Sequence, residues 1–144
     1  MRDDEISIHN FPLHAVDKIR YGDTDRQGHV NNAVFATFFE TGRVELLHNP
    51  QHPVADTGCA FVIAHLEVDF RAEILWPGDV VIGTRVTKLG SSSVRLAQAL
   101  FQGDRCTATA ETVIVQVDET TKKARTLSRV AVDYLTGLAD PQDQ

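Results

Sequence analysis

The segment from Arg20 to Arg43, RYGDTDRQGHVNNAVFATFFETGR, contains the side chains best suited to chemistry. Asp23, Asp25 and His29 lie in a polar, glycine-containing stretch that ends where an apolar helix pattern begins. If this stretch is extended, the two carboxylates point the same way because they are two residues apart. A carboxylate here could simply stabilise the helix start, where negative charge is favourable. Alternatively, Asp25 faces a cavity and attacks a carbonyl or activates water, while free amides at the helix start polarise that carbonyl.

Other common catalytic motifs are missing from the sequence. It contains no G-x-S-x-G nucleophile elbow, no G-x-x-x-x-G-K-[ST] phosphate loop, no G-x-G-x-x-G and no H-E-x-x-H. The serines at 91–93 lie in an expected hairpin turn with no base nearby in the sequence, which disfavours a serine nucleophile. His48 and His52 are four residues apart, but Pro50 interrupts the helical face between them. We therefore expect no metal site.

Length and composition indicate one globular domain without a membrane span. The chain has 144 residues, of which 42% are hydrophobic and 24% charged, and these values argue against disorder or a fibre. The formal net charge of −6 disfavours non-specific binding to nucleic acid or to an anionic membrane. No apolar run approaches the roughly 20 residues of a membrane helix, and no signal-peptide pattern opens the chain. We expect a cytoplasmic protein in which Cys59 and Cys106 are buried free thiols.

The elements that must position the candidate residues follow from hydrophobic periodicity. AVDKIRY, residues 15–21, is expected to form a short strand. Asn31 or Asn32 can cap a helix, because its side-chain oxygen satisfies a first-turn amide. Apolar residues then recur at three- and four-residue steps up to Leu47, with Gly42 in one row where a neighbour could pack closely. The prolines in HNPQHP, residues 48–53, should end this helix.

Downstream of the helix the pattern becomes strand-like. In VIAHLEVDFR, an apolar set alternates with polar residues and predicts a strand with one buried face. The apolar set is Val62, Ala64, Leu66, Val68 and Phe70. WPGD then predicts a turn, and three further strand-like runs at 80–89, 93–101 and 106–117 are joined by GSSS and by QGDR, a hairpin signal. SRVAVDYLTGL, residues 128–138, is expected to form a final short helix.

These elements predict an α+β fold. The apolar face of an antiparallel sheet and the aromatic face of the long helix can each be buried if the sheet wraps around the helix. We expect one domain over residues 1–144, with an N-terminal tail at 1–13 and a C-terminal tail at 136–144.

The motif DTDRQGHVNN, followed by the helix residues VFATFFETGR, resembles the hotdog-fold acyl-CoA thioesterases of the 4-hydroxybenzoyl-CoA thioesterase and YbgC/FadM-like group. The resemblance covers nearly the whole chain in element order: strand, loop, long helix and four antiparallel strands. It implies a hotdog fold and a hydrolase that cleaves an acyl thioester of CoA or of an acyl carrier protein. It also implies no cofactor, no nucleic-acid or membrane partner, and a homodimer or a dimer of dimers (a homotetramer) with sites at subunit interfaces.

The resemblance assigns roles to individual residues. It implies that Asp25 is the nucleophile or general base, that the backbone amide of Asn32 holds the thioester oxygen, and that His29 helps to orient substrate or water. Glu40 matches the catalytic carboxylate of another hotdog branch, and beside Asp25 we expect it to be a spectator or an ion-pair partner of Arg43. The expected substrate-binding set is Gly28, Asn31, Glu40, Ser91 and Ser92. The loop GHVNN departs from the G-V-V-Y-H type of the YbgC subgroup, so the acyl substrate of that subgroup does not carry over.

Several roles stay open at this level. His29 could instead brace the loop as a structural residue. Phe35, Phe38 and Phe39 are expected to pack in the core more than to line an acyl tunnel. Candidate contacts for the CoA phosphates are Arg71, Arg85, Lys88, Arg95, Lys122 and Lys123. The alternative functions are a non-catalytic acyl-thioester binding protein and a hydratase or dehydratase that acts on enoyl or β-hydroxyacyl thioesters.

Overall fold

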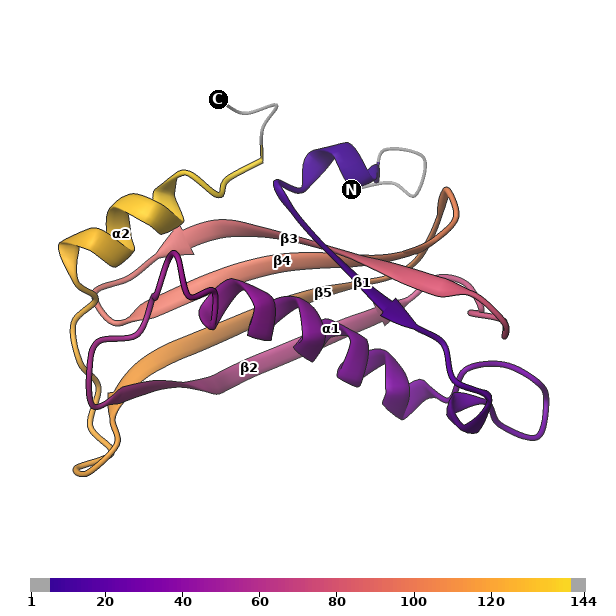
Figure 1. Cartoon of the computed structure of the whole chain (residues 1–144), viewed down its shortest axis with the longest axis horizontal. Coiled ribbons are helices and arrows are strands. Elements are labelled where there is room, and N and C mark those ends of the chain that lie inside the picture. Colours follow the sequence, from indigo (N-terminus) through magenta and orange to yellow (C-terminus); the bar gives the residue numbers. More distant parts are fainter. Residues whose placement is uncertain (1–5, 141–144) are drawn as a thin grey trace.

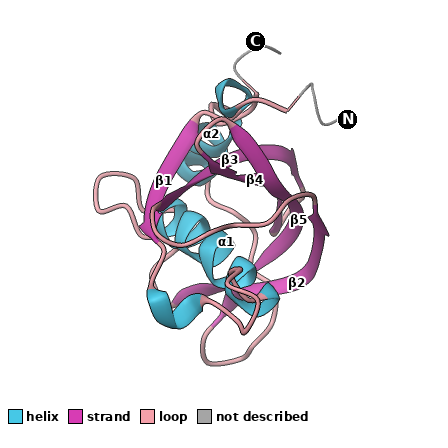
Figure 2. Cartoon of the chain, turned by 90° about the vertical axis from the view of Figure 1, so that its right-hand side faces the viewer, coloured by secondary structure: helices cyan, strands magenta, loops and turns pink. Residues whose placement is uncertain are grey.

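The computed structural model describes residues 6–140, and it has one five-stranded antiparallel sheet that curves around one long helix (Figures 1 and 2). The strands are β1 (Leu13–Lys18), β2 (Cys59–Phe70), β3 (Asp79–Leu89), β4 (Ser93–Gln102) and β5 (Arg105–Asp118), and the helices are α1 (Asn32–Leu47) and α2 (Arg129–Thr136). Two short 3-10 turns lie at Ile8–Asn10 and Tyr21–Asp23. No helix in this described range is long and apolar enough to cross a membrane.

The sheet order is β1-β3-β4-β5-β2, so β1 and β2 are its two edges. The predicted hairpins join β3 to β4 and β4 to β5, and Gly103 closes the second one with a φ of +62°, which glycine adopts without strain. The first strand was predicted at 15–21 but runs over Leu13–Lys18, because the chain turns into a 3-10 turn at Tyr21. The last predicted helix is confirmed as α2.

Helix α1 lies across the inner face of the sheet and buries its aromatic residues there. The side chain of Asn31 caps it by accepting a hydrogen bond from the Ala33 amide at 2.9 Å. Phe35, Phe38 and Phe39 are all buried and pack against β3, β4 and β5, so the predicted core role of these three rings is confirmed. The fixed direction of α1 places its first turn at one end of the sheet.

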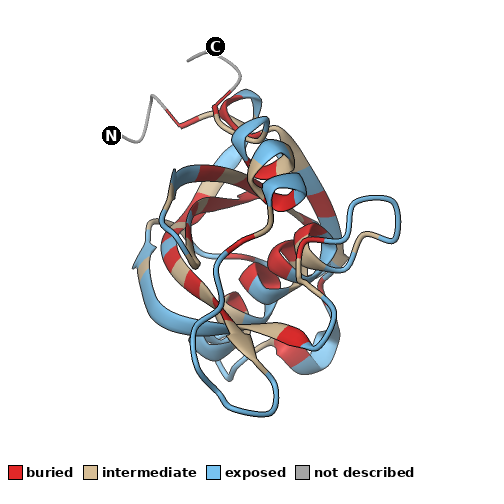
Figure 3. Ribbon diagram, turned by 90° about the vertical axis from the view of Figure 1, so that its left-hand side faces the viewer, coloured by how far each residue is buried: buried red, intermediate tan, exposed pale blue. Residues whose placement is uncertain are grey.

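Strand β2 does not have the buried face that its alternating pattern predicted. Most of this edge strand has the colour of exposed residues in Figure 3, although Cys59 is buried and Ala60, Phe61 and Val68 are half-buried. Its large apolar side chains are exposed by 46% at Val62, 50% at Ile63, 38% at Leu66 and 55% at Phe70. The reason is that β2 is an edge strand beyond the flank of α1, paired with β5 on one side only. A register shift between Ile63 and His65 also interrupts the alternation, because Ala64 is an extra residue there.

Two segments outside the expected central elements also pack on the sheet. Ile6 and Phe11, within the stretch expected as an N-terminal tail, are buried against β4. Asp140, in the expected C-terminal tail, is buried and pairs with Arg85 at 3.1 Å. The remaining residues of both tails, 1–5 and 141–144, lie outside the described range.

Gly42 sits where α1 approaches the sheet most closely, as the sequence pattern indicated. A Cβ atom at this position would lie 2.7 Å from both Gln98 Nε2 and Ile82 Cγ2. Gly42→Ala is therefore expected to lower the free energy of unfolding by about 1–3 kcal/mol through overpacking, although alanine favours helix by about 1 kcal/mol. Urea denaturation measures the change. Thr37→Ala on the same helix, away from this close approach, is the control, with an expected change within about 0.5 kcal/mol; equal stability of both variants would contradict the close approach.

Candidate functional site

The loop that carries Asp25 is a tight turn held by its own backbone. The Asp25 amide donates to the His29 carbonyl at 2.8 Å, and the Gly28 amide donates to the Asp25 carbonyl at 3.1 Å. Gly28 has a φ of +83°, the left-handed conformation that this turn requires. The side-chain Oδ1 of Asp25 accepts from the amides of Gln27 at 2.9 Å and His29 at 3.2 Å. No group in the described part of the chain donates to Oδ2, so one carboxylate oxygen is left for chemistry.

The neighbouring Asp23 has a different position and a structural role. It ends the 3-10 turn, is buried, and accepts a hydrogen bond from the Arg20 amide at 2.8 Å. The segment is not extended at Asp23, so the condition under which the two carboxylates would point the same way is not met: Asp23 turns inward and Asp25 is exposed. Asp23 therefore has a structural role in the turn, whereas Asp25 is the candidate reactive carboxylate.

The start of α1 lies beside this loop. Asn31 is the N-cap, so Asn32 is the first helical residue, and its backbone amide has no acceptor among residues 6–140. Asp25 and Asn32 line the same open cavity of about 330 Å³, which also contains His29, Phe35 and Phe70. A free amide with the positive end of a helix dipole behind it is suited to a partly negative oxygen.

The segment after β2 forms the opposite wall of the cavity. The Val30 amide donates to the Ile74 carbonyl at 2.9 Å, and His29 forms a bridge with Leu75, so the loop and this segment are tied together. His29 Nε2 lies 3.3 Å from Glu73 Oε2. This contact gives His29 a carboxylate partner that sequence reasoning missed. Glu73 lies in no periodic pattern or motif, and only the bridge between distant segments brings it to the site.

Phe35 and Phe70 form the apolar part of the cavity. Their rings meet edge to face with centroids 5.1 Å apart, one from α1 and the other from the end of β2. Phe35 is buried whereas Phe70 is largely exposed. The carboxylate and the free amide therefore lie at one side of an apolar surface that is open to solvent in a single chain.

Three of the expected substrate-binding residues lie away from this cavity. Ser91 and Ser92 are in the turn between β3 and β4, just before β4 begins. The other end of β4, at Gln102, lies near the Asp25 loop, because the Gln102 side chain hydrogen-bonds the backbone of Leu75. The length of β4 separates them from the Asp25 loop by about 30 Å within one chain. Glu40 is exposed on the flank of α1. Burial lowers the pKa of the Arg43 guanidinium, and the Glu40 carboxylate partly offsets this, which agrees with an electrostatic role for Glu40.

The basic candidates are also dispersed. Arg71 lines the cavity, whereas Arg85 pairs with Asp140 and Arg95 lies 3.9 Å from Glu111. Lys122 and Lys123 belong to the turn after β5. Of these residues, only Arg71 lies at the Asp25 site of its own chain.

The two cysteines are unpaired, and the expectation of free thiols is confirmed. Cys59 is buried, whereas Cys106 is half-buried, and burial raises the pKa of the Cys106 thiol. Within the described residues, no three His, Cys, Asp or Glu side chains gather in a way that could hold a metal ion.

The family comparison matches most of the chain. Residues 19–134 match the model of the thioesterase-like superfamily, and this span contains the Asp25 loop, α1 and the four long strands. The chain is also 28% identical over 119 residues to "Acyl-CoA thioester hydrolase YbgC" of Escherichia coli O6:H1, covering 80% of this chain and 89% of the relative.

Solved structures agree with the fold. The PA5185 protein of Pseudomonas aeruginosa PAO1 superposes with a TM-score of 0.83 at 24% identity, covering 94% of this chain and 96% of that one. A thioesterase from Thermus thermophilus, solved with coenzyme A and zinc, superposes with a TM-score of 0.76 at 27% identity, covering 89% of this chain and 95% of that one. The hotdog fold and the thioester hydrolase class that the sequence motif implied are confirmed. The chain belongs to the thioesterase-like superfamily.

Proposed function

We propose that the protein hydrolyses an acyl-CoA thioester to the free acid and CoA, with Asp25 as nucleophile or general base and the Asn32 amide as oxyanion donor. The observation that supports this most directly is that Asp25 and Asn32 line one cavity beside two phenylalanine rings. The names of relatives support CoA as the thiol: one is an acyl-CoA thioester hydrolase, and another is a thioesterase solved with coenzyme A.

The chemistry requires few groups. A thiol has an ordinary pKa of about 8.5, so a thiolate leaves without a strong general acid. Polarisation of the carbonyl and one carboxylate can therefore suffice, and an amide donor in such a site contributes about 3 kcal/mol. Oδ1 of Asp25 holds the turn, so Oδ2 is the oxygen that attacks the carbonyl or takes a proton from water. The reaction needs no cofactor, because CoA is part of the substrate.

The working unit is a homodimer formed through β2. This strand presents an unpaired edge, and Val62, Ile63, Leu66 and Phe70 on it are exposed. An edge with such side chains is a template for pairing with another strand, and pairing with its own copy about a two-fold axis would cover Ile63, Leu66 and Phe70 of both copies. A dimer of dimers is the expected larger assembly. Ser91 and Ser92 are too far from the Asp25 cavity of their own chain to contact a substrate bound there. They could contact a substrate bound to another copy, so their binding role stays a prediction.

We infer that the protein works in the cytoplasm, because both thiols are free where an oxidising compartment would favour pairing. The substrate is a small molecule, and the charge of −6 gives no support to a nucleic-acid or membrane partner.

A panel of acyl-CoA esters, with released thiol followed by a colorimetric reagent, tests the proposal. We expect saturable, enzyme-dependent release of CoA from at least one ester in the panel. Tight binding of CoA esters with no thiol released over hours would instead identify a non-catalytic binding protein.

A second function is favoured by one observation, the contact between His29 and Glu73. A histidine with a carboxylate partner can transfer protons at carbon, as a hydratase acting on enoyl thioesters requires. The same panel should therefore include an enoyl-CoA ester, with loss of the conjugated double bond followed by absorbance. The hydrolase proposal predicts thiol release and no hydration.

A further inference from the structure

An exposed aromatic pair lies next to the Asp25 loop, and the proposed chemistry does not use it. The rings of Tyr21 and Trp76 meet edge to face with centroids 5.2 Å apart. Tyr21 is 74% exposed, Trp76 is 46% exposed, and the neighbouring Leu75 is 44% exposed. An edge-to-face contact leaves at least one face of each ring uncovered by the other ring, so the pair offers an apolar surface to a planar ligand.

The two rings belong to segments that backbone contacts hold in place. Tyr21 begins a 3-10 turn, and its carbonyl accepts a hydrogen bond from the Thr24 hydroxyl at 2.7 Å. The Ile19 amide donates to the Gly78 carbonyl at 2.9 Å, which ties the segments of the two rings together. The surface is therefore formed before a ligand binds, and little conformational freedom is lost on binding.

The segment that leads from the site cavity to Trp76 is held by the end of β4. The Gln102 side chain accepts from the Leu75 amide at 3.0 Å and donates to the Leu75 carbonyl at 2.6 Å. Glu73 lines the cavity and is three residues from Trp76, so their Cα atoms are at most about 11 Å apart. The pantetheine arm and the diphosphate of CoA together are longer than this spacing. A thioester bound at Asp25 can therefore bring its adenine to the two rings.

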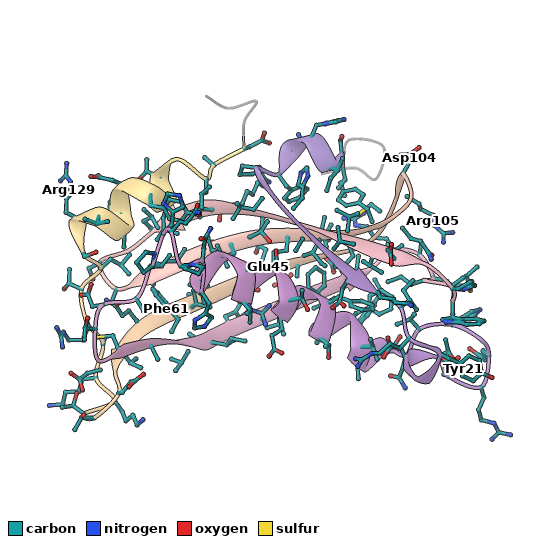
Figure 4. The ribbon with its side chains drawn as sticks, viewed as in Figure 1. Tyr21, Glu45, Phe61, Asp104, Arg105 and Arg129 are labelled. Atoms are coloured by element: carbon teal, nitrogen blue, oxygen red, sulfur yellow. The ribbon has the colours of Figure 1, made fainter. Side chains whose placement is uncertain are left out.

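Arg105 lies beside the same segment and suits the phosphates of such a ligand. Its Nη2 donates to the Glu73 carbonyl at 2.8 Å, and its other guanidinium N–H groups have no acceptor among residues 6–140. Figure 4 shows Arg105 and Tyr21 at the same end of the molecule. Asp79 and Asp104 are exposed at this end too, so the local charge is mixed and selectivity has to come mainly from the rings.

We propose that Tyr21 and Trp76 form a stacking surface for the adenine of CoA, by which the protein prefers acyl-CoA to the same acyl group on a carrier without a nucleotide. This inference rests on the proposed function, because it takes the Asp25 cavity as the thioester site. Aromatic side chains hold a base through its flat face, without reading its hydrogen-bonding edge. The adenine is remote from the reacting carbonyl, so the stack stabilises bound substrate and transition state equally and lowers KM without changing kcat.

The fluorescence of the protein reports on this surface directly, because Trp76 is the single tryptophan of the chain. Adenosine 3′,5′-bisphosphate, a fragment of CoA, should quench the fluorescence in a saturable way and inhibit acyl-CoA hydrolysis competitively, whereas pantetheine should cause no quenching. Tyr21→Ala should weaken the binding of the nucleotide fragment by about tenfold. If CoA binds to the protein without changing the fluorescence of Trp76, the adenine lies elsewhere and the inference fails.

Steady-state kinetics with a truncated substrate test the role of the stack in hydrolysis. Trp76→Ala is expected to raise KM for an acyl-CoA by about tenfold, to leave kcat unchanged, and to leave kcat/KM for the matching acyl-pantetheine unchanged. Trp76→Phe keeps an aromatic face and should retain most of the affinity. Val16→Ala removes a side chain that is 61% exposed on β1, and as the control it should change neither substrate's kinetics.

The outcomes separate this inference from the proposed function. Equal losses of Trp76→Ala on acyl-CoA and on acyl-pantetheine would show that Trp76 only supports the shape of the site. That result would overturn the inference and leave the hydrolase proposal intact. Saturable quenching by the nucleotide fragment in a protein that releases no thiol would support the stacking surface and overturn the proposed hydrolysis.

Discussion

Asp25→Asn is expected to lower kcat/KM for acyl-CoA hydrolysis by about 10²–10⁴-fold, the usual contribution of a positioned acid–base group. Asparagine keeps an oxygen in place of Oδ1, so it can still accept from the Gln27 and His29 amides and hold the turn. It loses the negative charge and the basicity of Oδ2, which are the properties that attack or water activation needs. The measurement is thiol release at saturating and at low substrate, together with thermal unfolding.

Asp23→Asn is the matched control, because it removes a carboxylate two residues away in the same loop. Asp23 accepts from the Arg20 amide and is buried, so its loss should lower the free energy of unfolding by about 1 kcal/mol while the folded protein keeps most of its turnover. The assignment would be wrong if Asp25→Asn retained near-normal turnover, or if both variants lost the same fraction of activity. In the second case, only the shape of the loop would matter.

The local features of the site could be predicted from the sequence. The turn at Asp25, the cap at Asn31 and the direction of α1 depend on residues within ten positions of one another, and such short-range patterns have few structural solutions. Gly42 is a similar case, since a glycine in an apolar helical row indicated the close contact with β3 and β4.

The rest of the site depends on contacts between distant segments. Phe70 and Glu73 reach the Asp25 loop only because Ile74 and Leu75 bond the backbone of Val30 and His29. No periodic pattern encodes that pairing. The separation of Asp23 from Asp25 could not be decided from the sequence for a different reason: their relative direction depends on the backbone, which forms a 3-10 turn at Tyr21–Asp23 where it could have been extended.

The alternation in β2 was correct from Leu66 to Phe70, was interrupted by the bulge at Ala64, and predicted a burial that the single chain does not have. An apolar face on a strand predicts that other side chains pack on it. The pattern cannot say whether those side chains belong to the same chain or to a second copy. In the isolated chain this face is open at Ile63, Leu66 and Phe70. The discrepancy is itself the main argument for a second copy.

Ile63→Asp is therefore expected to separate the dimer and to abolish most of the hydrolysis. Self-pairing of β2 about a two-fold axis would bring both substituted residues into the seam between the chains, so two carboxylates would enter one apolar interface. Burial of each unpaired charge costs several kcal/mol, which exceeds what the remaining contacts of this edge can offset. We expect the variant to elute as a monomer near 15.9 kDa, with unchanged far-ultraviolet circular dichroism, and to lose at least about 100-fold in kcat/KM because the proposed working unit is the dimer.

Val130→Asp is the matched control for the interface, since Val130 is 73% exposed on α2 away from β2. A new carboxylate there stays in water and meets no partner strand, so it should leave both mass and activity unchanged. A monomeric Ile63→Asp protein with full activity would show that one chain holds a complete site, whereas a wild-type protein that is already monomeric would remove the β2 dimer altogether.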